Sequence, residues 1–86
     1  MDNCTKIVVI VQEHRVETAT KVQDVLTEYG CNIRVRLGLH DSAMGSCSNT
    51  GMIMIQYCDE DNSVEEFIKK LTAIPSVKAK SMSLDF

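Results

Sequence analysis

The hydrophobic residues of this chain recur in six short blocks, whose spacing predicts four strands and two helices. Residues 6–12 and 51–58 are apolar on both sides of an extended chain, which is typical of strands covered on both faces. Residues 31–40 and 77–84 alternate between apolar and polar side chains, as half-buried strands do. In residues 31–40, the apolar side chains from Cys31 to Leu39 would share one face. Two further segments, 16–29 and the stretch between Ser63 and Pro75, have helical spacing.

The residues between these blocks predict where the elements begin and end. Gly30 lies at the C-terminal end of the first helix, where glycine is favoured. Ser63 and Glu66 have the spacing of a capping box at the start of the second helix, and Pro75 stops that helix. Residues 41–50 are rich in Ser, Gly and Asn, which predicts a loop.

The element order, βαββαβ, predicts one ferredoxin-like α+β sandwich over residues 1–86. In this fold a four-stranded antiparallel sheet carries both helices on one face, and the first and third strands are central. Those are the two strands that are apolar on both faces. The alternating strands would be the sheet edges, and their basic side chains discourage uncontrolled strand pairing. These residues are Arg34, Arg36, Lys78 and Lys80.

The sheet face without helices would expose Met52 and Met54, because nothing else in the chain is left to cover them. An exposed apolar patch usually marks an interface. A domain of 86 residues also has a thin core of its own. The sequence therefore predicts a homo-oligomer, a dimer or a tetramer, that buries this face.

Four cysteines stand at positions 4, 31, 47 and 58 without any CxxC pair, which excludes a zinc ribbon or thioredoxin motif. An even number allows disulfides, but the first residues are polar and no signal peptide precedes the first strand. We therefore expect reduced thiols and a cytoplasmic location. We interpret Cys31 and Cys58 as ordinary strand residues, and Cys4 as part of a loose N-terminus.

Three stretches resemble a known family: KIVVIVQEHRVETATKVQDVLTEYG (6–30), RLGLH (36–40) and GMIMIQY (51–57). They are similar to the iron-only hydrogenase system regulators, small stand-alone proteins that look like ACT domains and like the C-terminal domain of nickel-responsive repressors. The resemblance covers about residues 5–84 and implies an ACT-like, oligomeric, ligand-responsive regulatory domain, not an enzyme. Such repressors carry a DNA-binding segment before this domain, which has no counterpart here because the first strand begins at Lys6.

The resemblance also implies a ligand site. In ACT domains the ligand often lies near the turn after the first strand, at a subunit interface, and here that turn is Glu13, His14 and Arg15. Arg15 would hold a carboxylate. Arg36 and Gly38, in the second matching stretch, complete the expected ligand-binding set. The alternatives are a solvated turn and an edge strand with a charged face.

His40 and Cys47 flank the central loop and are the candidate metal ligands, with Asp41 as an oxygen donor. Imidazole and thiolate suit a transition metal such as zinc or nickel. One protomer offers too few ligands for a tetrahedral site, so a second copy would complete it across a two-fold axis. Cys47 as a nucleophile with His40 as base would instead be an enzyme site, but it lacks a suitably placed third group. In the third alternative, neither His40 nor Cys47 has a functional role.

The sequence thus predicts a cytoplasmic regulatory domain that binds a small molecule or a metal as a homo-oligomer. A structural protein–protein interaction module without a small ligand, and a Cys-dependent enzyme, are the alternatives. The net charge of -3 and the absence of Trp argue against nucleic-acid binding. No apolar run approaches the ~18 residues of a membrane helix, which argues against a membrane protein.

Overall fold

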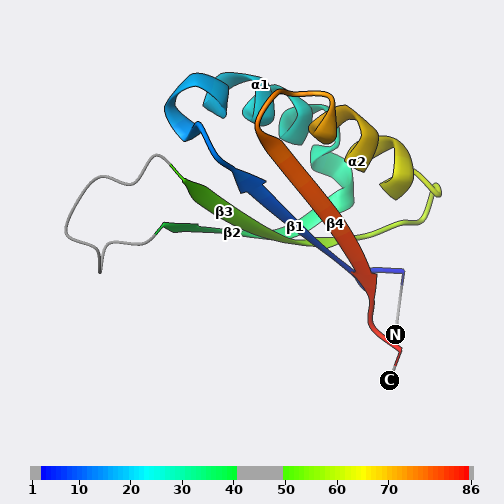
Figure 1. Ribbon diagram of the computed structural model, residues 1–86. Coiled ribbons are helices and arrows are strands. Elements are labelled where there is room, and N and C mark those ends of the chain that lie inside the picture. The colour runs from blue at the N-terminus through cyan, green and yellow to red at the C-terminus, as the bar shows by residue number, and fades with distance from the viewer. Residues whose placement is uncertain (1–2, 41–49, 86) are drawn as a thin grey trace.

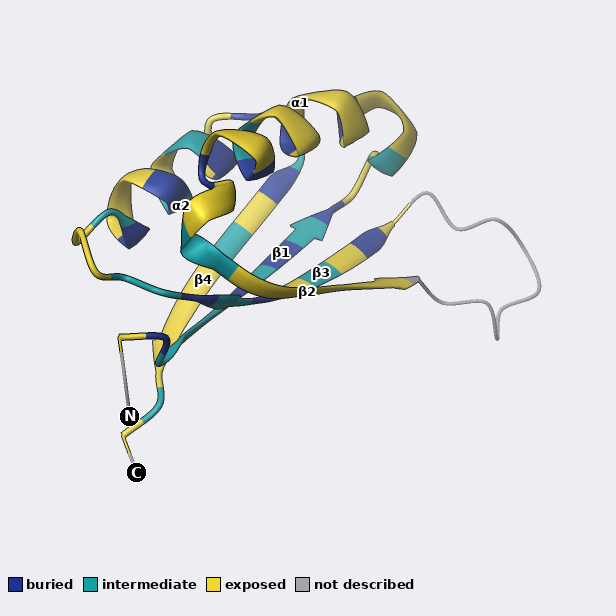
Figure 2. Ribbon diagram, turned by 180° about the vertical axis from the view of Figure 1, so that it is seen from behind, coloured by how far each residue is buried: buried dark blue, intermediate teal, exposed yellow. Residues whose placement is uncertain are grey.

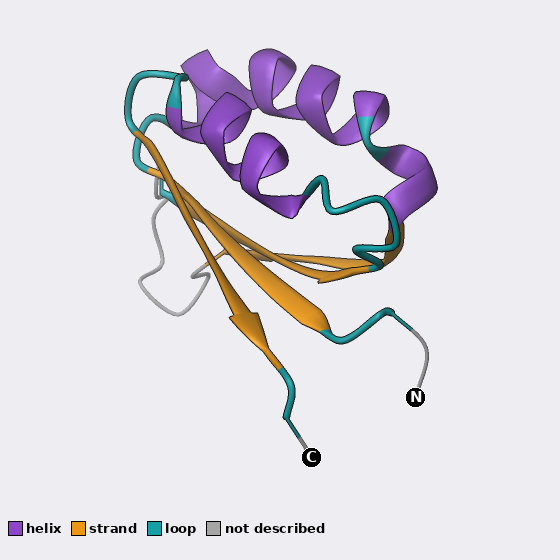
Figure 3. Ribbon diagram, turned by 90° about the vertical axis from the view of Figure 1, so that its right-hand side faces the viewer, coloured by secondary structure: helices purple, strands orange, loops and turns teal. Residues whose placement is uncertain are grey.

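A computed structural model of the protein describes residues 3–40 and 50–85. The elements are β1 (Lys6–Gln12), α1 (Arg15–Glu28), the short 3-10 helix η1 (Gly30–Asn32), β2 (Ile33–His40), β3 (Gly51–Tyr57), α2 (Val64–Thr72) and β4 (Val77–Ser83). The strands form one antiparallel sheet in the order β2-β3-β1-β4. Both helices cover the same face of it (Figures 1 and 3). The predicted ferredoxin-like α+β topology is confirmed, with β1 and β3 in the centre.

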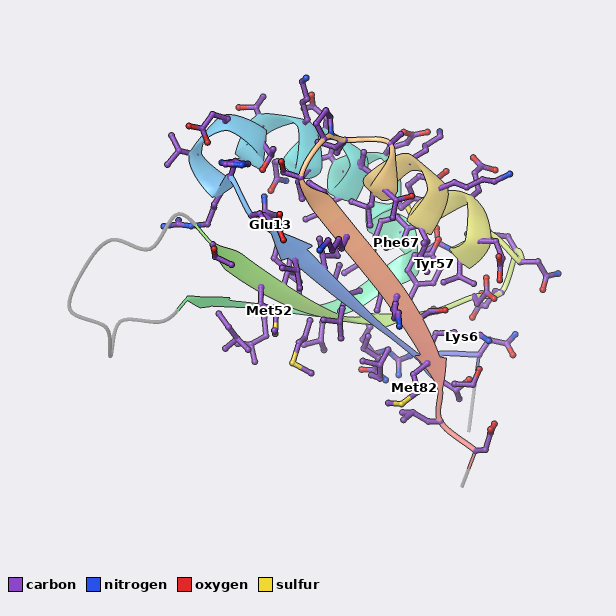
Figure 4. The ribbon with its side chains drawn as sticks, in the orientation of Figure 1. Lys6, Glu13, Met52, Tyr57, Phe67 and Met82 are labelled. Atoms are coloured by element: carbon purple, nitrogen blue, oxygen red, sulfur yellow. A yellow bond between two sulfur atoms is a disulfide. The ribbon has the colours of Figure 1, made fainter. Side chains whose placement is uncertain are left out.

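The core lies between the sheet and the two helices. The inward-facing side chains of the central strands, Ile10 and Tyr57 among them, meet Phe67 of α2 and are fully buried. The ring of Phe67 stacks on Tyr57, with centroids 4.9 Å apart, and is tilted against Tyr29 at 5.1 Å. Figure 4 shows Tyr57 and Phe67 inside this layer. Each such burial stabilises the fold by about 1.5–3 kcal/mol.

The opposite side of the sheet carries large apolar side chains that remain accessible, and we call this set the open face. Its exposed members are Val35, Leu37, Leu39, Met52, Met54 and Met82. Strand pairing aligns Leu37 with Met54 and Leu39 with Met52, so they form one continuous patch. Met52 and Met82 point away from the helices (Figure 4), and Figure 2 shows exposed positions along these strands. The prediction that Met52 and Met54 are left uncovered is confirmed, at 40% and 38% exposure.

A β-bulge changes the face of β2. Ile33 pairs with Tyr57 and Val35 pairs with Gln56, so the pairing skips Arg34. The extra residue reverses the alternation, because side chains change face at every step of a strand. Ile33 therefore packs against the core, whereas Val35 and the apolar residues after it lie on the open face. The prediction of one shared apolar face from Cys31 to Leu39 is wrong, and Cys31 itself belongs to η1.

The start of α2 also differs from the prediction. Ser63 makes no capping bond with its side chain. Its hydroxyl donates instead to Asp61 Oδ1 (2.6 Å). The backbone N–H of Val64 is bound by Asp59 Oδ1 at 3.0 Å. Asp59 thus satisfies one of the free N–H groups of the first turn, and the predicted capping box between Ser63 and Glu66 is wrong.

Residues 3–5 are fastened to the end of the sheet. The N–H of Asp59 donates to the carbonyl of Asn3, and the N–H of Leu84 donates to the carbonyl of Thr5. Cys4 is 2% exposed and forms a disulfide with Cys58. The expectations of a loose N-terminus and of reduced thiols are wrong for this pair.

The disulfide joins two residues 54 positions apart, a proximity that only the folded backbone creates. The cytoplasmic location rested on reduced thiols and stays a prediction. No helix in residues 3–40 and 50–85 is long and apolar enough to span a bilayer.

Candidate ligand-binding site

A cavity of about 290 Å³ lies between α1 and the β2–β3 half of the sheet, and we call it the α1 cavity. Its apolar walls come from both layers: Ala19, Val22 and Leu26 of α1, and Ile53 of β3. Its polar lining includes two arginines, Arg15 and Arg36. Among the described lining residues there is no carboxylate, so the cavity is locally positive in a chain of net charge -3.

Arg15 is the first residue of α1, and its aliphatic stem lies against Gly51 at the start of β3. A Cβ atom at Gly51 would stand 2.6 Å from Cδ of Arg15. That is closer than atoms can approach, so only glycine leaves room for the stem in this position. The absence of a side chain at Gly51 therefore allows the Arg15 side chain to lie against β3.

Arg36 reaches the cavity from β2. Because of the bulge at Arg34, Arg36 pairs with the buried Ile55 and so faces the helices. Its Nη1 atom donates a hydrogen bond to Gln23 Oε1 of α1, at 3.2 Å. This contact bridges the two layers and orients the guanidinium at the cavity.

Gln12 supplies a buried amide to the same lining and is 4% exposed. Its Nε2 atom donates to Thr18 Oγ1 at 3.5 Å, and that hydroxyl donates to the carbonyl of His14 at 2.9 Å. Three lining residues were not predicted from the sequence: Gln12, Gln23 and Gly51. Gln12 carried a signal, since it is a polar residue at the inward-facing position of an otherwise apolar strand.

The structure gathers three of the five predicted ligand-binding residues, Arg15, Arg36 and Gly38, around the α1 cavity. The other two lie elsewhere. Glu13 forms an ion pair with Lys78 of β4, at 3.2 Å. His14 lines a separate depression, next to Pro75. Adjacent residues of the predicted turn thus face different surfaces.

The predicted metal ligands fall at the limit of the described chain. His40 is the last residue of β2, and Asp41 and Cys47 lie outside the described residues. Within residues 3–40 and 50–85, no group of three or more His, Cys, Asp or Glu side chains could hold a metal ion. A zinc or nickel site at His40 and Cys47 stays a prediction.

No protein-family model and no curated protein matches the sequence. Among solved structures, the chain is similar to the uncharacterized protein TM1266 from Thermotoga maritima, with 25% identity and a TM-score of 0.77 over 93% of this chain and 95% of that one. It is also similar to a formyltetrahydrofolate deformylase from Pseudomonas putida KT2440, with 15% identity and a TM-score of 0.56. That match covers 92% of this chain but 28% of the deformylase, and it shows the fold alone.

Proposed function

We propose that the protein is an ACT-like regulatory domain that binds a small carboxylate with an apolar tail in the α1 cavity. The observation that carries this function is the convergence of Arg15 and Arg36 on one cavity with apolar walls. A guanidinium binds a carboxylate through two parallel hydrogen bonds. The apolar walls would take the hydrocarbon part of the ligand, as in most small-molecule sites.

Two further observations support the regulatory part of the proposal. The sequence resembles the iron-only hydrogenase system regulators in the stretches that build β1, α1 and β3. The match to the deformylase covers 28% of that longer chain, and this shared fold supports an ACT-like domain. We expect no catalysis in the α1 cavity, where the ionisable groups of the described lining are two arginines.

The proposal includes self-association through the open face. The patch is apolar over β2, β3 and β1, while Lys78 and Lys80 of β4 stand beside Val11 and Val9 at its border. An apolar centre with a polar rim is the usual composition of an interface. A second copy is the occupant that fits, because two such sheets can stack about 10 Å apart with their apolar faces together.

The size of the open face predicts how strong this association is. Four strands of about seven residues, spaced about 4.8 Å apart with about 3.3 Å per residue, cover roughly 450 Å². Stable interfaces bury about 800 Å² per partner. Association through this face alone is therefore expected to depend on concentration in the micromolar range, and a second contact would be needed for a permanent assembly.

The ligand proposal is tested by calorimetric titration with a panel of aliphatic carboxylic acids, with their primary amides as uncharged controls. Arg36→Gln should weaken acid binding about tenfold, since a hydrogen bond to a charged group contributes about 1.5–3 kcal/mol. Arg34→Gln is the matched control, because Arg34 lies two residues away on β2 but outside the α1 cavity. Equal weakening by both variants, or no acid bound by the wild type, would refute the site.

A protein–protein interaction module is the second candidate function, and the open face is the observation that favours it. This function needs no ligand in the α1 cavity. A protein that self-associates or binds a partner through Met52 and Met54, and binds none of the acids, would have this second function.

A further inference from the structure

We propose that Cys31 and the Cys4–Cys58 disulfide form a thiol–disulfide exchange site, separate from the α1 cavity. In this site Cys31 attacks Cys58 and releases Cys4. The three cysteines line one cavity of about 300 Å³ at the end of the sheet near the N-terminus. Cys31 is exposed and not disulfide-bonded, so the cavity holds an accessible thiol beside a disulfide.

Backbone pairing holds Cys31 close to Cys58. The N–H of Cys58 donates to the carbonyl of Asn32 at 2.7 Å. The side-chain amide of Asn32 donates back to the carbonyl of Cys58 at 3.0 Å. Cys31 is thus the chain neighbour of the residue that pairs directly with Cys58. Cys31 and Cys58 also line the same cavity, and a disulfide between them would need a Cα separation of no more than about 6.8 Å.

The exchange balances without any external oxidant or reductant. The thiolate of Cys31 attacks Sγ of Cys58, and a Cys31–Cys58 bond forms as the Cys4–Cys58 bond breaks. The electron pair of the broken bond leaves with Sγ of Cys4, which takes up the proton that Cys31 lost. One disulfide and one thiol are present before and after the step.

The step changes how the N-terminus is held. Before exchange, residues 3–5 are fastened by the disulfide and by backbone hydrogen bonds to Asp59 and Leu84. The side-chain amide of Gln56 also donates to the carbonyl of Cys4. After exchange, only the hydrogen bonds hold residues 3–5, so this segment separates from the sheet more readily. The Cys4 thiol, buried until then, becomes available to small-molecule or protein disulfides.

The experiment follows the position of the free thiol by maleimide labelling and peptide mass spectrometry. A Cys47→Ser background removes the fourth cysteine of the chain. Fresh protein should carry the label on Cys31 and a Cys4–Cys58 disulfide. After anaerobic incubation at mildly alkaline pH, where thiolate attack is faster, label should appear on Cys4 together with a Cys31–Cys58 disulfide. The rate should not depend on protein concentration, because the attack is intramolecular.

Cys31→Ser in the same background is the matched control and should lose the exchange completely. Hydrogen exchange gives a second readout. The Asp59 amide, which donates to Asn3, should exchange faster after incubation of the Cys31 protein but not of the Cys31→Ser variant. The proposal is overturned by label that stays on Cys31, by a rate that rises with protein concentration, or by fresh protein without the Cys4–Cys58 disulfide.

Discussion

The hydroxyl of Tyr29 donates a 2.5 Å hydrogen bond to the carboxylate of Glu66, which joins the end of α1 to the first turns of α2. Lys70 completes the contact, with Nζ 5.3 Å from the centre of the Tyr29 ring and 3.6 Å from Glu66. Burial and the bond to Glu66 raise the pKa of Tyr29. The same bond and the charge of Lys70 lower the pKa of Glu66. This cluster ties the two helices together over Phe67.

Tyr29→Phe should lower the free energy of unfolding by about 1 kcal/mol at neutral pH, because one hydrogen bond between the helices is lost. The effect should depend on pH in two windows. The lowered pKa of Glu66 stabilises the fold above its ordinary value, about 4.3, and this stabilisation is lost as the pH falls through the lowered pKa. The raised pKa of Tyr29 stabilises the fold below about 10, and this is lost as the pH rises further.

Urea unfolding of wild type and Tyr29→Phe across the pH range measures these differences. Glu65→Gln is the control, since it removes an exposed carboxylate of α2 next to Glu66, whereas the Tyr29 hydroxyl donates to Glu66. A stability difference between wild type and Tyr29→Phe that is the same at pH values below 4 as at neutrality would contradict the assigned role of Glu66.

Gly51→Ala should displace the Arg15 side chain from β3 and weaken binding of aliphatic carboxylates in the α1 cavity. The added methyl group would lie 2.6 Å from Cδ of Arg15, so the arginine stem must move. Gly30→Ala is the matched control for backbone effects, because a Cβ at Gly30 meets no atom within 4 Å and Gly30 does not line the α1 cavity. Calorimetric titration of both variants checks this, and an unchanged affinity in Gly51→Ala would show that Arg15 does not touch the ligand.

Met54→Lys should shift the protein toward the monomer in sedimentation velocity experiments at micromolar concentrations. The substitution places a charge in the centre of the open face, where burying each methionine would contribute about 1.5–3 kcal/mol. Val16→Lys is the control, since Val16 is also an exposed apolar residue, at 74% against 38% for Met54, but lies on α1. A wild type that stays monomeric at every concentration would exclude self-association through this face.

Cys58→Ala should lower the free energy of unfolding by about 2–4 kcal/mol relative to the oxidised wild type, because the disulfide closes a long loop of the unfolded chain. Cys31→Ala removes an exposed cysteine outside the disulfide and should change stability by less than about 0.5 kcal/mol. Denaturant unfolding with and without reductant measures both. If reductant does not destabilise the wild type, the disulfide contributes nothing to folding.

Much of the fold was predictable from the sequence, because the pattern of apolar and polar residues in each strand depends on the environment of its two faces. The doubly apolar strands at 6–12 and 51–58 are the central ones, since one face of each packs against the helices and the other face forms the middle of the apolar open face. The bulge at Arg34 was not predictable in this way. It shifts the pairing of β2 by one residue, which moves Arg36 to the helix-covered face and Val35 to the open face.

The candidate site was predictable only in part, because strand register also determines which side chains face the α1 cavity. Arg15, Arg36 and Gly38 were predicted as ligand-binding residues, and the tertiary structure brings them together while it separates Glu13 and His14 from them. By itself, the sequence determined the elements, their order and the apolar character of the open face. The tertiary structure decided every contact between distant residues: the Cys4–Cys58 disulfide, the bond between Tyr29 and Glu66, and the fit of Arg15 against Gly51. Hydrophobic periodicity reports the local environment of a residue, whereas these contacts depend on strand register and helix docking, which involve the whole chain at once.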